Sequence, residues 1–327
     1  MISRTTNHFL DNGLCPVVVP SFTRCFRLAH AHAPLSNEEK LPMNENEKYL
    51  FDLNGYLVVK GALRADQVSA LNEAIDHNRD KIHIRTREQA LDGSLKEQGG
   101  RAAAGLKGTH GRGDFGGFLF WEEPWGRPFR DLIAAPFAMR AMLATIGPRF
   151  RLGGTAGLTM TKGSEGFIFH GGGTPELEHM GECFYHRFEN GRMRNGLMSV
   201  SYSLTDTGPE DGGFACIPGS HKANFLCPLG VRRLEVDLEV VKHIALRAGD
   251  AVIFTEALTH GTLPWKADFE RCLLRYLYAP AIHTGGFSGG EFAAYEHELT
   301  PLQRVMVEPP YHPGDVDIAG MLEEEIS

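Results

Sequence analysis

The chain has 327 residues, of which 42% are hydrophobic and 23% are charged, and its formal net charge at pH 7 is −8. This length allows one large domain or two small ones, and the composition is ordinary for a globular protein. The acidic balance argues against binding of a nucleic-acid polymer, which requires a basic surface. Small anionic substrates are still allowed, because a few arginines can hold a phosphate or a carboxylate within an acidic protein.

The cysteines and the apolar segments indicate the compartment. The six cysteines form no Cys-x-x-Cys pair, which is typical of free thiols in a reducing environment. No apolar run approaches the roughly 20 residues that are needed to cross a bilayer. The sequence therefore predicts a cytoplasmic protein with no membrane partner.

The first residues differ in character from the rest of the chain. The short β-prone run Val17–Val19 lies between two prolines and has no obvious strand partner nearby. We predict that residues 1–45 form a flexible N-terminal extension, that 46–315 form a single domain, and that 316–327 form a C-terminal tail.

The start of the predicted domain combines one strand with two helical stretches. A turn at Asn54-Gly55 precedes a β-branched and aromatic strand, and Asp66 begins a helix with apolar residues at helical spacing. Residues 84–115 are polar, glycine-rich and basic, which is typical of a long functional loop. Pro128 begins a second helical stretch, which Gly147-Pro148 ends.

Beyond Phe150 the pattern is one of short strands separated by glycine, proline and aspartate. The predicted strands are 156–161, 166–170, 197–204, 213–217, 238–245, 251–255 and 271–278. Short strands at this spacing favour a sandwich or a barrel over a doubly wound sheet. We predict a mainly β fold with flanking helices, in which a helical N-terminal layer packs on an eight-stranded double-stranded β-helix (a cupin-like jelly roll).

Two histidines stand at the ends of predicted strands far apart in the chain. His170 ends the apolar run that starts at Phe167, and His260 follows the strand 251–255 after a short connection. Arg271 comes eleven residues after His260, and Arg275 lies four residues further along the same predicted strand. Because side chains alternate along a strand, both arginines point to the same face.

The sequence resembles the phytanoyl-CoA dioxygenase family of iron(II)/2-oxoglutarate oxygenases from about residue 46 to residue 310. The resemblance rests on ordered segments with matching spacing: Phe51–Leu63, Leu204–Asp206, Asp211–Phe214, Ile217–Lys222, Gly249-Asp250, Thr259–Gly261 and Arg271. It implies an iron(II) held by His170 and His260, with 2-oxoglutarate and dioxygen as co-substrates. It also implies that Arg271 binds the far carboxylate of 2-oxoglutarate, and Arg275 is a second candidate for that role.

Gly172 departs from the family pattern, which has a metal-binding aspartate at this position. A glycine two residues after the first histidine resembles the iron(II)/2-oxoglutarate halogenases, in which a halide binds the iron where the carboxylate is missing. On this interpretation Gly172 is the halide position and chloride is a co-substrate. A substrate carbon radical would then combine with the halide instead of with hydroxide, and a halogenase acting on a small metabolite is the first hypothesis.

Two alternatives remain open. The glycines after His170 also fit a flexible turn, in which case a hydroxylase would take its third ligand from Glu176, Glu178, His179 or Glu182. Loss of the metal would leave a non-catalytic protein that binds a small molecule.

The segment between the two histidine strands offers candidates for the substrate entrance. Tyr185, His186, Arg192 and Arg194 all fall within it. Together with Arg101, Lys107 and Arg112, the two arginines of this segment would suit an anionic substrate such as a nucleotide.

Overall fold

The computed structural model describes residues 43–85, 105–172, 183–283, 286–288, 290–309 and 316–327. These residues belong to one compact unit that spans Glu38–Ser327. Most of the predicted N-terminal extension lies outside the described residues, so its flexibility stays a prediction. None of the helices in the described part of the chain has the length and apolar content that a bilayer crossing requires.

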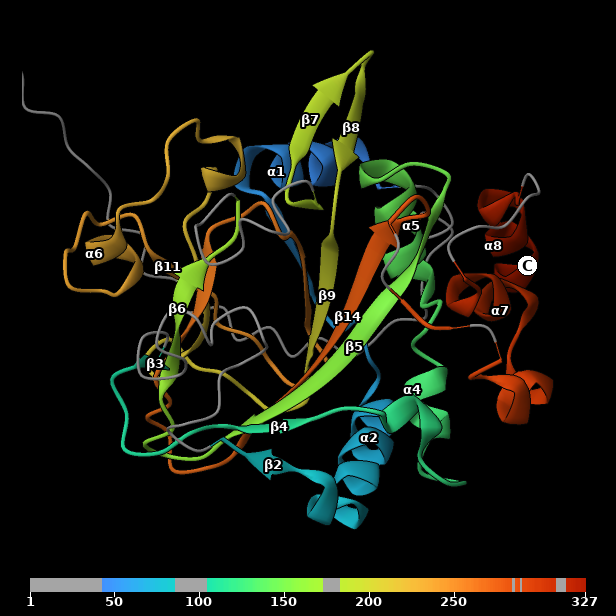
Figure 1. Ribbon diagram of the computed structural model, residues 1–327, viewed down its shortest axis with the longest axis horizontal. Helices are drawn as coiled ribbons and strands as arrows, with labels where there is room; N and C mark the ends of the chain where they lie inside the picture. Colours follow the sequence, from blue (N-terminus) through green and yellow to red (C-terminus); the bar gives the residue numbers. More distant parts are fainter. Residues whose placement is uncertain (1–42, 86–104, 173–182, 284–285, 289, 310–315) are drawn as a thin grey trace, which may run out of the picture. The chain divides into compact units, whose positions relative to one another are not determined.

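Antiparallel strands form two larger sheets and one hairpin (Figure 1). The seven-stranded sheet has the order β1 (Tyr56–Val59), β12 (Ala251–Thr255), β9 (Met198–Ser203), β14 (Arg271–Pro280), β5 (Phe150–Met160), β4 (Gly113–Phe115) and β2 (His83–Ile84). The five-stranded sheet has the order β11 (Lys242–His243), β10 (Gly213–Cys216), β13 (His260–Leu263), β6 (Gly166–His170) and β3 (Gly105–Leu106). Strands β7 (His186–Glu189) and β8 (Arg192–Asn195) form a hairpin that extends beyond both sheets in Figure 1. The predicted mainly β, jelly-roll fold is confirmed.

Helices cover the seven-stranded sheet on the side away from the five-stranded sheet. They are α1 (Glu45–Asn54), α2 (Ala65–His77), α4 (Arg127–Arg130), α5 (Pro136–Thr145), α7 (Pro301–Val307) and α8 (Ile318–Ile326). In contrast, α6 (Leu229–Arg232) contacts β6 of the smaller sheet (Figure 1). Tyr276 and Tyr278 of β14 are buried in this helical layer, where their hydroxyls donate to Phe129 O at 2.7 Å and to Ile133 O at 3.0 Å. Each such buried bond contributes about 1 kcal/mol and fixes the strand against the helices.

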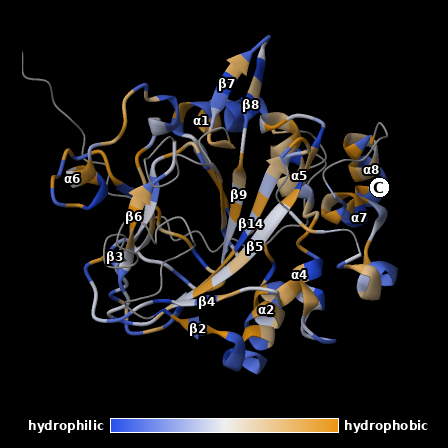
Figure 2. Ribbon diagram, viewed as in Figure 1, coloured by the Kyte–Doolittle hydropathy of each residue, from blue (hydrophilic) through white to orange (hydrophobic). Residues whose placement is uncertain are grey.

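Strand alternation separates an apolar face from a polar one within the large sheet. On β14, Leu274 and Tyr276 lie in the helix-side core, so Arg271 and Arg275 point to the opposite face. That face is turned towards the small sheet, because Phe254 of β12 packs against Phe214 of β10 at 5.0 Å between ring centroids. Figure 2 shows hydrophobic residues in both sheets, with polar residues interspersed along the strands. The interior between the sheets is therefore partly polar, and it is there that a site can form.

Three segments differ from the prediction in detail. The helical stretch from Pro128 divides into α4 and α5, because the residue before Pro136 cannot stay helical and Ala135 has ψ 127°. Helix α1 was not predicted, although Asn44 and Glu47 form a capping box at its start. Residues 316–327, predicted as a tail, include α8, whose buried side chains join the main core.

Candidate metal centre

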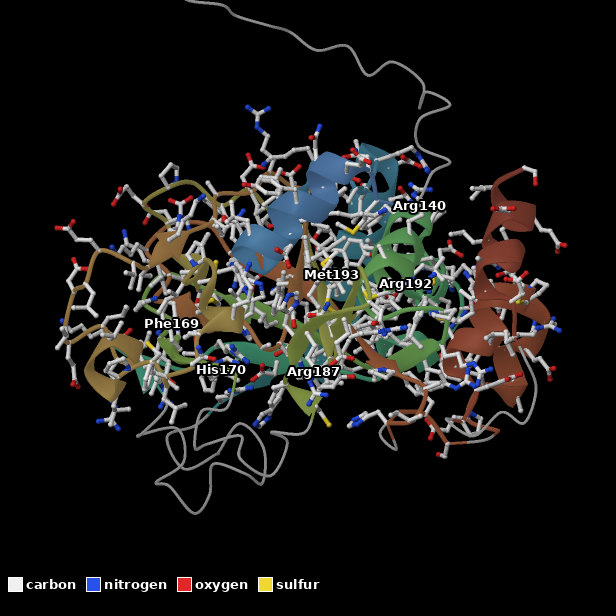
Figure 3. All side chains as sticks on the ribbon, turned by 90° about the horizontal axis from the view of Figure 1, so that it is seen from above. Arg140, Phe169, His170, Arg187, Arg192 and Met193 are labelled. Atoms are coloured by element: carbon white, nitrogen blue, oxygen red, sulfur yellow. The ribbon has the colours of Figure 1, made fainter. Side chains whose placement is uncertain are left out.

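The two histidines of the sequence pattern are neighbours across two paired strands. His170 of β6 and His260 of β13 are directly opposite in the antiparallel register, and their ring centroids are 4.4 Å apart. A register shift between His260 and Thr262 marks an irregularity beside the pair. Such irregularities re-aim side chains next to active sites. Figure 3 labels His170 at the end of β6.

Backbone carbonyls fix the orientation of both imidazole rings. Nδ1 of His170 is 2.9 Å from Ile168 O, and Nδ1 of His260 is 2.8 Å from Leu258 O. A carbonyl can only accept, so each Nδ1 carries the proton and each Nε2 keeps its lone pair for a ligand. Burial lowers the pKa of His260, and burial with the neighbouring His260 lowers the pKa of His170 well below its usual range. Both rings are therefore neutral near pH 7, which is the form that binds a metal.

A carboxylate that sequence analysis missed lies beside this pair. Glu256 stands in the short connection from β12 to β13, and one ligand atom from each of Glu256, His170 and His260 lies within 4.8 Å of the other two. Its Oε2 atom is 3.7 Å from His260 Nε2. The available signal was an acidic residue four positions before the second histidine, whereas the family pattern places the third ligand just after the first histidine.

Arg271 is a buried cation with no anionic partner among the described residues. Its side chain is 2% exposed, its Nε atom has no hydrogen-bond partner, and its Nη1 atom meets the sulfur of Met160 at 3.4 Å. Burial, followed by the nearby charge of Arg112, lowers its pKa to about 10. A guanidinium held dry and unpaired in this way is a ready partner for an anionic ligand.

Arg275 is paired, in contrast to Arg271. Its Nη1 atom is 3.5 Å from Glu256 Oε1, and its side chain is 40% exposed. The structure therefore favours Arg271 over Arg275 as the residue that would bind the far carboxylate of 2-oxoglutarate. Two neutral histidines with free Nε2 atoms, a neighbouring carboxylate and an unpaired guanidinium fit an iron(II) ion with 2-oxoglutarate.

Gly172 lies against the backbone of the β12–β13 connection. It has φ 52°, its amide donates to Glu256 O at 3.2 Å, and a Cβ atom there would overlap with Ala257 O. A side chain at this position would have to displace the connection that carries Glu256. The halide role of Gly172 stays a prediction. The alternative ligands Glu176, Glu178, His179 and Glu182 lie outside the described residues.

His186 contributes to a polar network at the base of the β7–β8 hairpin. Its Nδ1 atom is 2.9 Å from Asn195 Oδ1, its Nε2 atom is 3.3 Å from Asp52 Oδ1, and its ring stacks edge-on against His221. These contacts tie the hairpin to α1 and to the turn that carries His221. The predicted substrate role of His186 remains a prediction.

The other predicted entrance residues are spread along the hairpin. The Tyr185 ring lies under the guanidinium of Arg187 at 5.2 Å, and Arg194 donates to Ile146 O at the end of α5. Arg192 is exposed on β8, the strand that contacts α5, and Figure 3 labels it apart from His170. The predicted substrate role of Tyr185, Arg192 and Arg194 stays a prediction.

Comparison with models of protein families gives one match over most of the chain. The family model described as phytanoyl-CoA dioxygenase (PhyH) matches residues 51–272, which include both histidines, Glu256 and Arg271. The chain belongs to the phytanoyl-CoA dioxygenase family. The family predicted from the ordered motifs is thereby confirmed, and it makes the protein a dioxygenase-type oxidoreductase. The match does not distinguish halogenation from hydroxylation.

Solved structures with the same fold include HygX from Streptomyces hygroscopicus. The structure with nickel, 2-oxoglutarate and hygromycin B bound has a TM-score of 0.57 and 21% identity, and the match covers 75% of this chain and 91% of HygX. The iron-bound structure of HygX has a TM-score of 0.55 and 23% identity, with 76% and 90% coverage. At these identities the likeness shows the fold. No curated protein sequence matches the chain.

Proposed function

We propose that this phytanoyl-CoA dioxygenase family member is an iron(II)- and 2-oxoglutarate-dependent oxygenase that hydroxylates a small molecule. The observation that carries the proposal is the pair of neutral histidines together with the unpaired, buried guanidinium of Arg271, which lies against Gly213 of β10, the strand that pairs with the His260 strand β13. HygX has been solved with nickel, 2-oxoglutarate and a small molecule, and it has the same fold. When bound, iron(II) with 2-oxoglutarate would activate dioxygen for oxidation of a substrate carbon.

The residues of this chain would bind and orient the co-substrate. His170 and His260 would hold the metal through Nε2, with their rings fixed by the carbonyls of Ile168 and Leu258. Arg271 would bind the far carboxylate of 2-oxoglutarate from its buried position, where a charge-assisted bond is strongest. Orientation of 2-oxoglutarate between these two points is what the protein supplies.

A basic residue near the site supports an anionic substrate. Arg112, one of the residues singled out in the sequence, lies close enough to His170 and Arg271 for its charge to add to burial, the main cause, in lowering the pKa of each. Its own guanidinium is paired with Asp114 at 3.1 Å and faces the Phe167 ring. Lys107 and Arg192 are exposed, and Arg101 lies outside the described residues. Among the described members of that cluster, Arg112 is the one beside the centre, and it favours a substrate with a phosphate or carboxylate group.

Halogenation is the second candidate, and Gly172 is the observation that favours it. Position 172 lacks the aspartate that the family pattern has, so residue 172 supplies no carboxylate, and on the halogenase hypothesis chloride would take that ligand's place on the metal. The test is product mass after turnover with iron(II), 2-oxoglutarate, chloride and a panel of small metabolites. A chlorine isotope pattern that bromide competes away supports halogenation. A product heavier by one oxygen, formed equally without chloride, supports hydroxylation.

The histidine pair is expected to be essential for metal binding. His170→Ala and His260→Ala should each remove tight Mn(II) binding and iron-dependent succinate formation, because a site with one imidazole loses its chelating geometry. Equilibrium dialysis followed by metal analysis measures the binding. His297→Ala is the control, because that side chain is 77% exposed and stands outside the cluster. Wild-type binding in either site variant would contradict the assignment.

A further inference from the structure

We propose that Glu256 is the carboxylate ligand of the metal centre and that it takes the place of the aspartate missing at position 172. The third ligand then comes from the connection between β12 and β13, not from the residue two positions after the first histidine. This inference rests on the proposed function, because it requires a metal held by His170 and His260. It names a ligand that the family pattern does not supply.

The two oxygens of Glu256 have different surroundings. Oε1 accepts a hydrogen bond from the Ser199 hydroxyl and lies 3.5 Å from Arg275 Nη1. Oε2 lies 3.7 Å from His260 Nε2, which is too long for a hydrogen bond. Atoms that each stand about 2.0–2.2 Å from one shared ion are about 3–4 Å apart, so this separation fits two ligands of one metal. One oxygen is thus held by the protein while the other faces the histidines.

The burial of Glu256 also points to a cation at this place. Its side chain is 5% exposed, and a buried carboxylate is costly unless charge or hydrogen bonds compensate it. Arg275 compensates only in part, because its side chain is 40% exposed and its approach to Oε1 is 3.5 Å. Both imidazoles present Nε2 as an acceptor, so neither can donate to Oε2. A divalent ion bound by the two Nε2 atoms and by Oε2 would compensate the buried negative charge and would give each of the three acceptors a partner.

The glycines after His170 explain how Glu256 reaches the histidines. A Cβ atom at Gly171 would overlap with Leu258 O and stand 2.7 Å from Glu256 O, and one at Gly172 would overlap with Ala257 O. The backbone of residues 256–258 therefore approaches as closely as it does only because both positions lack a side chain. A residue with a side chain at position 172, such as the family's aspartate, would therefore be incompatible with the position that the Glu256 backbone has here.

Whether Glu256 binds the metal determines whether the centre can halogenate or hydroxylate its substrate. With Glu256 on the metal, the centre keeps two histidines and one carboxylate, which leaves the usual three positions for 2-oxoglutarate and dioxygen. No position is then left vacant for a halide, so hydroxylation follows. If Glu256 did not bind, the additional position would be open to chloride.

The first experiment measures metal affinity in the absence of 2-oxoglutarate. Glu256→Ala and the isosteric Glu256→Gln should weaken Mn(II) and Co(II) binding by more than about 100-fold, beyond the 10–100-fold typical of losing a residue that only supports a ligand. Glu298→Gln is the matched control, because Glu298 is also mostly buried and also pairs with an arginine, Arg130. Unchanged affinity in Glu256→Gln would overturn the inference.

A second readout separates a ligand from a residue that only packs beside the site. Chloride should bind the Co(II)-loaded Glu256→Ala protein more tightly than the Co(II)-loaded wild type, as followed in the absorption spectrum, because the variant has lost one anionic ligand and gained one open position. Formate should restore metal affinity to Glu256→Ala but not to His260→Ala. Equal chloride affinity in the wild type and in Glu256→Ala, or a lack of any formate effect, would refute the role of Glu256 while leaving the histidine site intact. If the wild type bound no metal, the proposed function itself would fail. Should Glu256→Ala not fold, Glu256→Gln serves for the chloride test.

Discussion

Arg271→Met should weaken 2-oxoglutarate binding about 10- to 100-fold while making the ligand-free protein more stable. A charge-assisted contact to the co-substrate is worth about 1.5–3 kcal/mol, which gives that loss of affinity. The gain in stability arises because burial lowers the pKa of Arg271 to about 10 from 12.5. A lowered folded-state pKa means that the charged form is disfavoured by folding, so at pH 7 the full cost applies, on the order of 3 kcal/mol. Methionine retains the bulk and removes the charge.

The change in 2-oxoglutarate affinity and the change in stability can both be measured by thermal unfolding. Thermal unfolding of the Mn(II)-loaded protein with increasing 2-oxoglutarate gives the ligand affinity, and unfolding without ligand gives the stability. Arg151→Met is the control, because Arg151 is also buried with a lowered pKa but donates to Val305 O of α7. It should leave 2-oxoglutarate binding unchanged. If Arg271→Met bound 2-oxoglutarate normally, the co-substrate would have to use Arg275 instead.

The fold could be predicted from the sequence because the residue pattern of its strands is distinctive. The runs that became β6, β12 and β14 are apolar, short and bounded by glycine or aspartate, and the structure places each within a few residues of its predicted bounds. Helix boundaries were harder to predict. Pro136 interrupts a stretch that looks continuous by apolar spacing, so α4 and α5 read as one helix.

The candidate site was predictable only in part, and the reason is topological. His170, His260 and Arg271 could be named because each follows or begins an apolar strand. Which residue faces them from a neighbouring connection depends on strand register, and the direct opposition of His170 and His260 is a property of the folded sheet. Glu256 looked like one of many acidic residues until that register was known. The family resemblance made Arg271 the first candidate for binding the 2-oxoglutarate carboxylate and Arg275 the second, and the structure shows that Arg271 is unpaired whereas Arg275 pairs with Glu256.

Gly172→Asp should impair metal binding and destabilise the protein, although it restores the family's sequence pattern. The Cβ atom of the new side chain would overlap with Ala257 O, on a backbone with φ 52°. Left-handed strain of about 1–2 kcal/mol and overpacking of about 1–3 kcal/mol add to an expected loss of about 2–5 kcal/mol. The connection must move to accommodate the aspartate, and Glu256 moves with it. Chemical denaturation and Mn(II) titration measure the two effects.

Gly117→Asp separates the backbone strain from the steric clash. Gly117 has φ 65°, and a Cβ atom at this position would have no neighbouring atom within 4 Å. Its replacement should cost only the strain and leave Mn(II) affinity unchanged.

The halogenase hypothesis makes the opposite forecast for Gly172→Asp, in which an aspartate entering a vacant halide position should strengthen metal binding and turn chlorination into hydroxylation. A stable Gly172→Asp protein with tighter Mn(II) binding would therefore show that position 172, and not Glu256, faces the metal. Weaker binding that the additional change Glu256→Ala does not reduce further would show that the aspartate acts by displacing Glu256.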